Sequence, residues 1–260
     1  MRPGMPPTPA QRLAAREHPG GFPVMHQRWS KLLFLHWPIS PAIIQARLPH
    51  GLFADTYDGQ AWIGVVPFAM ECVRPSLLPP LPYLSWFLEL NVRTYVHDAA
   101  GRPGVWFFSL DCNQPIAVEI ARHLFHLPYQ HAAMRLRETM GQIDFSSRRK
   151  APGEIDALFQ YEAPSHAQAA TNGSLDAFLV ERYTLFSSGK NGQLLAGRVH
   201  HAPYQISAAR CTAWSTNPLR LTGFPEPAQA PTSMLVANPV NVAIFPLKAQ
   251  IVDQSAPSAP

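Results

Sequence analysis

The chain has 260 residues, of which 47% are hydrophobic and 15% charged, so it is long enough to bury a sizeable core. The net charge is +4, but the basic residues are dispersed. The densest cluster, Arg148, Arg149 and Lys150, lies in a Ser-rich stretch typical of a solvated turn, which weighs against a nucleic-acid partner. Three widely separated cysteines without a CxxC spacing indicate neither a zinc ribbon nor a disulfide framework.

The ends of the chain and its longest uncharged segment bear on location and domain organisation. Residues 1–10 are Pro-rich and lack the apolar core of a secretory signal. The uncharged stretch between Arg74 and Glu89 contains four prolines and is too short to span a bilayer. We therefore expect a cytoplasmic protein without membrane contact. We also expect one domain over residues 25–250, with flexible tails at residues 1–24 and 251–260.

The predicted elements are mostly strands. In chain order, strands are expected at residues 31–37, 52–57, 60–66, 83–96, 105–110, 131–138, 142–148, 155–161, 181–186, 193–200 and 240–247. Short helices are expected near residues 40–48 and 175–180. Asp58-Gly59 and the turn at 190–193 have the composition of tight hairpins. Many strands with few helices predict a mainly β fold, a β-rich α+β chain that forms a barrel or a strongly curved antiparallel sheet.

One longer helix is predicted at residues 114–125. Asn113 can cap it, and Pro115 fits its first turn. Its apolar stripe consists of Ile116, Ala117, Ile120, Ala121 and Leu124.

The strand at residues 86–96 carries the most informative pattern, because side chains of a strand alternate between its two faces. One face is apolar apart from a threonine. The other face holds Phe87, Glu89, Asn91, Arg93 and Tyr95. An exposed face with a Glu–Arg pair accounts for this pattern, and so does the inside of a barrel where these groups line a ligand site. In the second interpretation, Glu89 or a ligand anion neutralises Arg93.

Other candidates lie on neighbouring strands. Asp111 is expected on the same face as Val105 and is either an acid/base group or a cap of the next helix. His36, in an apolar strand, is a candidate ligand contact, although a lone core histidine is usually structural. His200 and His201 point to opposite faces, so only one can enter a given site; His200 is the candidate.

The sequence lacks the common metal and nucleophile motifs. It contains no HExxH, HxH, GxSxG, P-loop or GxGxxG pattern, so we predict no bound metal and no cofactor. The four lysines are Lys31, Lys150, Lys190 and Lys248. None has the setting of a Schiff-base lysine, which needs burial or a neighbouring cation to lower its pKa.

Five ordered segments together resemble a known family. They are residues 33–38 (LFLHWP), 90–96 (LNVRTYV), 104–111 (GVWFFSLD), 178–183 (FLVERY) and 199–203 (VHHAP). In this order they resemble the YqjF-like family of uncharacterised proteins, a branch of the acetoacetate decarboxylase-like superfamily. The resemblance covers roughly residues 25 to 250 and implies a curved β-barrel with a central pocket.

The resemblance also bears on chemistry. Acetoacetate decarboxylase uses a Schiff-base lysine beside a second lysine, assisted by a glutamate and an arginine. The resemblance implies that Glu89 takes the place of that glutamate. The lysine pair is absent, since residues 106–109 read Trp-Phe-Phe-Ser, so Schiff-base decarboxylation is not expected.

Two functional hypotheses follow. In the first, the protein binds a small carboxylate metabolite, either as a binding protein or as a lyase- or hydrolase-like enzyme without a Schiff-base lysine. Arg93 holds the carboxylate, Asn91 and Tyr95 orient the ligand, and Glu89 or Asp111 acts as acid/base. In the second, the protein is a non-enzymatic ligand-sensing or protein-interaction module, supported by the apolar, Pro-rich loop at residues 75–82. The sequence leaves the oligomeric state open.

Overall fold

Strands are the main regular element of the computed structural model, which describes residues 4–149 and 156–250. The strands are β1 (Met25–Ser30), β2 (Leu32–Ile39), β3 (Leu52–Ala54), β4 (Ala61–Pro75), β5 (Phe87–Asp98), β6 (Pro103–Cys112), β7 (Tyr129–Thr139), β8 (Gln142–Arg149), β9 (Asp156–Glu162), β10 (Gln168–Ala169), β11 (Thr184–Ser188), β12 (Leu194–His200), β13 (Gln205–Ala208), β14 (Cys211–Ala213), β15 (Ser233–Ala237), β16 (Val240–Ile244) and β17 (Lys248–Ala249). The helices are α1 (Pro9–Ala14), α2 (Pro41–Gln45), α3 (Pro115–Phe125), α4 (Leu175–Val180) and α5 (Asn217–Leu221). Within the described ranges, none of the helices combines the length and apolar character that a membrane span needs. The predicted tail at residues 251–260 lies outside the described residues.

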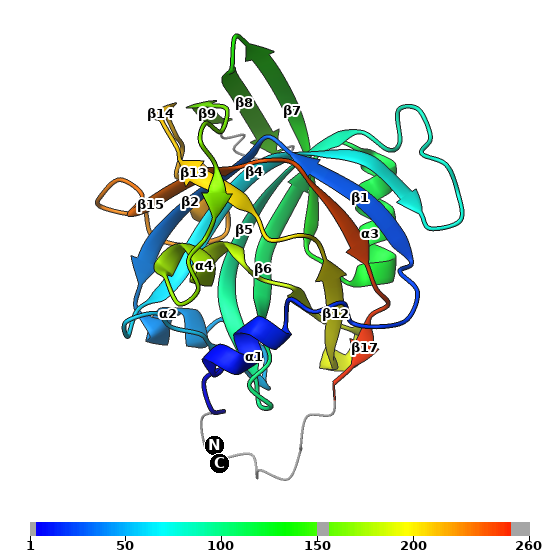
Figure 1. Ribbon diagram of the computed structural model, residues 1–260, viewed down its shortest axis with the longest axis vertical. Helices are drawn as coiled ribbons and strands as arrows, with labels where there is room; N and C mark the ends of the chain where they lie inside the picture. Colours follow the sequence, from blue (N-terminus) through cyan, green and yellow to red (C-terminus); the bar gives the residue numbers. More distant parts are fainter. Residues whose placement is uncertain (1–3, 150–155, 251–260) are drawn as a thin grey trace.

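Among the described residues, seven strands close into a barrel. Each pairs with the next in the order β1, β4, β5, β6, β11, β12, β16, and β16 pairs back with β1. Neighbours are antiparallel except β6 and β11. In Figure 1, β4, β5 and β6 lie side by side in this ring. The predicted mainly β fold, built on a curved and largely antiparallel barrel, is therefore confirmed.

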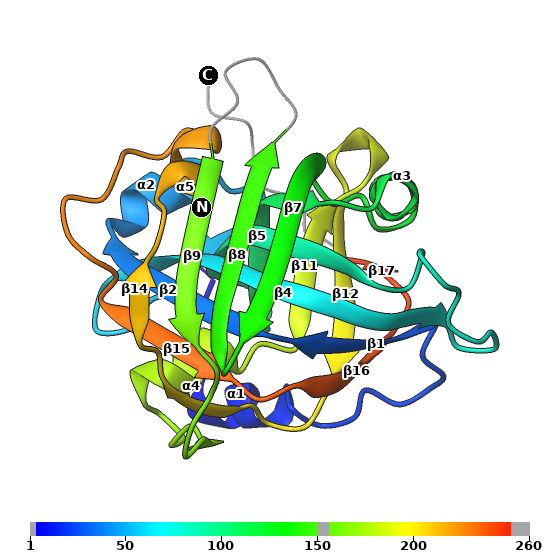
Figure 2. The same cartoon turned by 90° about the horizontal axis from the view of Figure 1, so that it is seen from above.

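A second sheet covers the outside of the barrel. After a short parallel pairing with β6, β7 runs antiparallel to β8, and β8 to β9. Figure 2 shows these three strands side by side across β2, β4 and β5. Between the two layers lies an apolar core that includes Leu35, Val65, Val92, Phe145 and Phe159. The central barrel strands are thus covered on one face by this core and face the barrel interior with the other.

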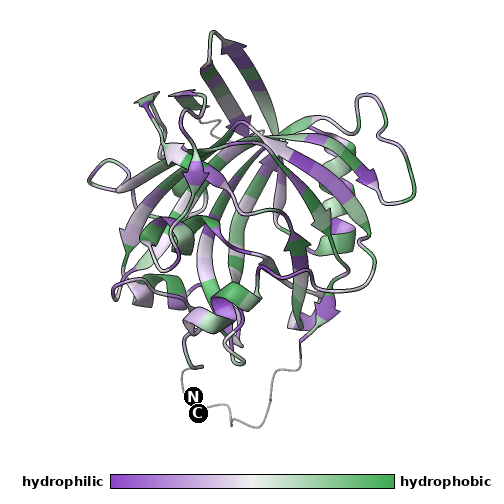
Figure 3. Cartoon of the chain, viewed as in Figure 1, coloured by the Kyte–Doolittle hydropathy of each residue, from purple (hydrophilic) through white to green (hydrophobic). Residues whose placement is uncertain are grey.

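Side chains along the strands alternate between these two environments, the outer core and the barrel interior. On β5, Leu90 and Val92 belong to the outer core, whereas Phe87 and Tyr95 belong to the cluster inside the barrel. Figure 3 shows the resulting bands of apolar and polar residues along the strands. The face of each β5 side chain therefore follows from its position in the strand.

The turns and helix caps differ from expectation in two places. Asp58 and Gly59 adopt the positive φ values, 49° and 76°, of a primed turn, but the strand before them, β3, pairs with β5 rather than with β4. The α3 cap is Gln114, whose side chain accepts from the Ile116 amide; Asn113 instead accepts a hydrogen bond from the Leu88 amide. At the start of α4, the Ser174 side chain accepts a hydrogen bond from the Ala177 amide and caps the helix.

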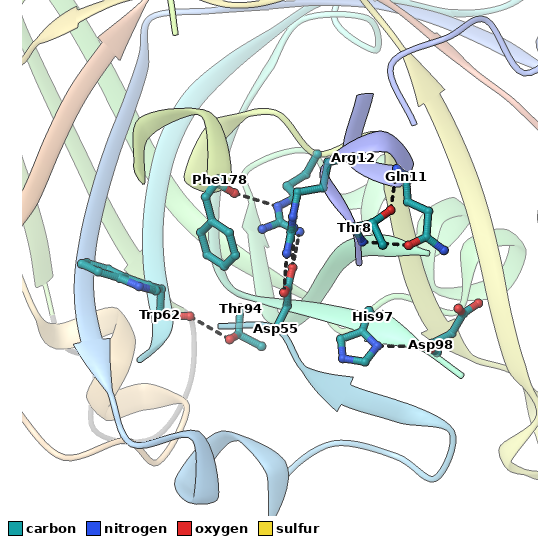
Figure 4. Close-up of polar contacts among 10 residues, drawn as sticks. Thr8, Gln11, Arg12, Asp55, Trp62, Thr94, His97, Asp98 and Phe178 are labelled. Carbon is teal, nitrogen blue, oxygen red and sulfur yellow. Dashed lines mark hydrogen bonds and ion pairs between the residues drawn. The ribbon is translucent and has the colours of Figure 1, made fainter. Parts of the chain in front are cut away.

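The N-terminal segment contains a helix that the sequence analysis does not predict. Thr8 and Gln11 form a reciprocal capping box at the start of α1. From this helix, Arg12 donates two hydrogen bonds of 2.7 Å to the buried carboxylate of Asp55 (Figure 4). Residues 9–14 therefore pack on the barrel, whereas the sequence predicts a flexible leader.

Candidate ligand-binding cavity

The barrel encloses a cavity of about 650 Å³. Its walls are mostly apolar and come from the inward faces of β1, β2, β4, β5 and β6, with contributions from α3 and the loop between β4 and β5. Some lining residues are also solvent-exposed and so mark the opening. They include Val24, Leu78, Leu81, Ile116, Ile120 and Leu124. The opening thus lies between α3 and the β4–β5 loop.

A row of polar residues on β5 crosses one wall of this cavity. Glu89, Asn91 and Arg93 all line it, because alternate residues of a strand share a face. Successive residues rise about 3.3 Å, so Glu89 and Arg93 are separated by roughly 13 Å along the strand. No ion pair joins them among the described residues, so Glu89 does not neutralise Arg93 as the sequence suggests.

Arg93 lies at the inner end of the row and has no acidic partner within the described ranges. It is 9% exposed. One terminal nitrogen donates to the Leu179 carbonyl at 3.1 Å and, more weakly, to the Tyr95 hydroxyl at 3.4 Å. Its guanidinium lies over the Phe34 ring, 5.3 Å from the centroid, while Nε has no hydrogen-bond partner. The cavity wall therefore presents a buried cation with unused donor capacity.

Tyr95 and His36 lie behind Arg93 and do not themselves line the cavity. Nε2 of His36 is 2.6 Å from the Tyr95 hydroxyl. Because Arg93 can only donate, Tyr95 accepts from it and keeps its own proton available for His36. Burial, followed by the charge of Arg93, holds the pKa of His36 well below its ordinary value, so the ring is neutral at pH 7. Gly64 makes room for it, since a Cβ there would lie 2.8 Å from His36 Cδ2.

Glu89 lies nearer the opening and accepts a hydrogen bond of 2.7 Å from the Tyr129 hydroxyl. Burial raises its pKa to about 7, although hydrogen bonds from Tyr129 and Asn91 oppose this shift. Oδ1 of Asn91 has no partner among the described residues. Glu89 can therefore both give and take a proton near neutral pH, beside an amide oxygen that is free to accept from a ligand.

The raised pKa of Glu89 predicts a specific dependence of stability on pH. A carboxyl group whose pKa rises on folding stabilises the fold below its unfolded pKa, near 4.5, and loses that contribution as pH rises through about 7. Chemical denaturation of wild type and Glu89→Gln should show wild type losing on the order of 3 kcal/mol relative to the variant between pH 4.5 and 8. Because both proteins share every other titrating group, the contributions of those groups cancel in the difference between the two free energies of unfolding. A constant difference across this range would contradict the raised pKa.

Arg182 also lines the cavity. It donates to Asp55 at 2.7 Å and to the Phe178 carbonyl at 2.7 Å, so Asp55 bridges it to Arg12 of α1. Figure 4 shows Arg12 and Asp55 joined by hydrogen bonds, with Phe178 close by. The single carboxylate of Asp55 thus pairs with two guanidinium groups, so the inner end of the cavity has an excess of positive charge.

Sequence comparison places the chain in a family. The profile of DUF2071, described as an uncharacterized conserved protein (COG2071), matches residues 26–241. The chain belongs to this family. It is also 41% identical over 191 residues to the uncharacterized protein YqjF of Bacillus subtilis (strain 168), a match that covers 74% of this chain and 78% of YqjF.

Structural comparison identifies the fold type. Acetoacetate decarboxylase from Legionella pneumophila subsp. pneumophila str. Philadelphia 1 matches with a TM-score of 0.59, covering 92% of this chain and 93% of that one at 13% identity. The enduracididine biosynthesis enzyme MppR, in complex with pyruvate, matches with a TM-score of 0.59, covering 90% and 92% at 12% identity. At this identity the likeness shows the fold alone, so this DUF2071 member has the acetoacetate decarboxylase-like barrel.

Lysines do not contribute to the described part of the cavity. On β6, the residues that face it are Val105, Phe107 and Leu110. Lys31 pairs with Glu138, and Lys248 is exposed on β17. The side chains of Lys150 and Lys190 are outside the described part of the structure.

Asp111 lies on the opposite face of β6 from the one that the sequence predicts. Arg93 pairs with Phe107 but Val92 pairs with Ser109, so Phe108 is an extra residue in β6. Such a bulge reverses the alternation beyond it. Asp111 therefore points away from the cavity and pairs with Arg149 at 2.6 Å. Because Asp111 does not reach the cavity, it is not placed to act as an acid/base group on a ligand there.

The two adjacent histidines also lie outside the cavity lining. Val199 faces the cavity, so the next residue, His200, points outward and packs against His18 with ring centroids 4.9 Å apart. His201 is buried between Tyr183 and Tyr204, and burial lowers its pKa to about 4. Within residues 4–149 and 156–250, no group of three or more His, Cys, Asp or Glu side chains has the arrangement of a metal site.

Sequence reasoning missed Tyr129, Arg182 and Asp55. Tyr129 hydrogen-bonds Glu89 across 40 residues, and Arg182 pairs with Asp55 across 127. No local spacing signals contacts at such separations. The only available signal was the Glu-Arg-Tyr run at residues 181–183, which lies within a segment that resembles the family.

Proposed function

We propose that this protein binds a small carboxylate in the barrel cavity, with the guanidinium of Arg93 receiving the carboxylate group. The observation that carries the proposal is the burial of Arg93 in the cavity wall without an acidic partner among the described residues. An unpaired buried cation is costly, and a bound anion offsets that cost. Arginine also suits a carboxylate because its planar fork can donate two parallel hydrogen bonds.

Other features support this proposal. Asn91 and Tyr95 flank Arg93 on β5, where Asn91 orients the ligand and Tyr95 orients the arginine. The barrel of MppR, which has the same fold, is in complex with pyruvate, itself a carboxylate. The loop at residues 75–82 contributes Leu78 and Leu81 to the cavity lining, which favours a cavity role for this loop over a protein-interaction role.

Glu89 supplies the reactivity in the enzymatic form of the proposal. With a pKa of about 7, it can exchange a proton with a bound carboxylic acid substrate in a lyase- or hydrolase-like reaction that needs no imine. The alternative is a ligand sensor that uses Arg93 in the same way but leaves its ligand unchanged. Measuring product formation distinguishes the enzyme from the ligand sensor. If the protein is an enzyme, Glu89→Gln should still bind the ligand but should no longer form product.

Calorimetric titration with pyruvate tests the proposed anchor. Arg93→Leu should weaken binding by at least about 30-fold, since removing one partner of a buried charge pair costs 2 kcal/mol or more. Arg135→Leu is the matched control, because it removes the same charge from an exposed position on β7. Equal dissociation constants for wild type and Arg93→Leu would overturn the proposal.

A further inference from the structure

We infer that the ligand of this cavity is a monocarboxylate with an extended apolar group, whose carboxylate lies at Arg93 and whose apolar end reaches the opening beside α3. This inference rests on the proposed function and names its ligand class.

The cavity is large for a small acid. A volume of about 650 Å³ falls within the roughly 300–1,000 Å³ of cavities that hold drug-sized ligands. A three-carbon acid at Arg93 would leave most of this space to water. Water in an apolar enclosure lacks the two to four polar partners that stabilise it, so a larger ligand suits the cavity better.

The wall of the cavity is mostly apolar. Phe34, Val66, Phe68 and Phe107 surround the path from Arg93 toward the opening. Glu89, the acid on this path, is hydrogen-bonded to Tyr129 and is largely uncharged below pH 7. Gln27, Arg74 and Ser85 also line the cavity, but most of its other lining side chains are apolar, which matches an apolar chain.

The cavity extends along β5 toward the opening beside α3. On β5, the lining runs from Arg93 to Phe87, a distance of roughly 20 Å at 3.3 Å per residue. It ends at α3, where Ile116, Ile120 and Leu124 recur at helical spacing.

These α3 residues line the cavity and yet are 53%, 45% and 65% exposed. An exposed apolar cluster that continues into a cavity marks a ligand-binding surface. The apolar end of the ligand therefore has a surface to cover on α3 and on the facing Leu78 and Leu81.

A series of straight-chain acids tests the inference. Butanoate, hexanoate, octanoate and decanoate should bind with an affinity that rises about fourfold for each methylene group. 1-Octanol, which has the chain but no charge, should bind at least about 30-fold more weakly than octanoate. Titration calorimetry on the full-length chain measures both effects.

Matched variants locate the chain in the cavity. Ile120→Ser should weaken decanoate binding by about tenfold and leave butanoate unchanged, because only the longer chain reaches α3. Leu77→Ser is the control, since Leu77 is 97% exposed and does not line the cavity. Both side chains are partly or fully in solvent, so neither substitution disturbs the core.

The outcomes separate this inference from the proposed function. If all four acids bind equally and each loses affinity in Arg93→Leu, the carboxylate anchor stands and the apolar chain is overturned. If affinity rises with length but Arg93→Leu binds decanoate as wild type does, the anchor itself is overturned, and the inference with it. Length dependence together with loss in Arg93→Leu and in Ile120→Ser supports both.

Discussion

Replacing Asp55 with Ala is expected to lower the free energy of unfolding by about 3–5 kcal/mol, because it leaves buried guanidinium charge without its counterion. The Asp55 side chain is fully buried and pairs with both Arg12 and Arg182 at 2.7 Å. Burial alone would raise its pKa, but the two arginines outweigh burial and hold the pKa below its ordinary value. Urea denaturation at pH 7 measures the loss.

Arg12→Ala is the matched control for this substitution. The Arg12 side chain is 30% exposed, and its removal leaves Asp55 paired with Arg182, so the expected cost is only about 1–2 kcal/mol. Arg12→Ala should also make residues 4–24 more sensitive to protease, because Arg12 ties α1 to the barrel. A cost for Asp55→Ala no larger than that for Arg12→Ala would contradict a buried counterion role.

The polar row on β5 could be predicted from the sequence because the alternation on that strand is unbroken. Glu89, Asn91 and Arg93 lie two positions apart along the strand, and no bulged residue of β5 intervenes. A pleated strand must place such residues on one face. What the sequence did not settle was whether that face is wet or enclosed, since this depends on the strands that close the barrel.

The prediction for Asp111 failed for a local reason. The strand pattern of β6 shows no Gly or Pro near Phe108 to signal the bulge. One extra residue moves every later side chain to the other face. The alternation therefore held for Val105 and Phe107 and failed from Ser109 onward.

The Asp55–Arg182–Arg12 cluster could not be predicted for a different reason. Its members come from α1, the segment after β3 and the segment after α4, and they meet only because the barrel and its N-terminal helix are assembled. A Pro-rich leader has the composition of a disordered tail. The buried ion pair of Arg12 with Asp55 supplies a specific contact that composition does not reveal.

Arg93→Leu is expected to separate stability from binding. In the absence of ligand, the variant should be as stable as wild type or more stable by about 1–4 kcal/mol, since an apolar side chain replaces an arginine whose burial no carboxylate compensates. The Leu179 carbonyl loses its hydrogen bond from Arg93, which limits the gain. This expectation reverses the one that follows from a Glu89–Arg93 pair, where breaking the pair would cost about 3–5 kcal/mol.

Adding ligand should make wild type more stable than Arg93→Leu, which reverses the order of their free energies of unfolding. At a concentration 100 times its dissociation constant, decanoate should stabilise wild type by about 2.7 kcal/mol and leave Arg93→Leu nearly unchanged. Urea denaturation of both proteins, with and without decanoate, gives all four free energies, and Arg135→Leu should behave as wild type in each condition. If Arg93→Leu without ligand lost 3 kcal/mol or more, Arg93 would be a structural residue held by Leu179 and Tyr95. The Arg93 guanidinium would then not be available to bind a carboxylate, and the proposed binding function would fail.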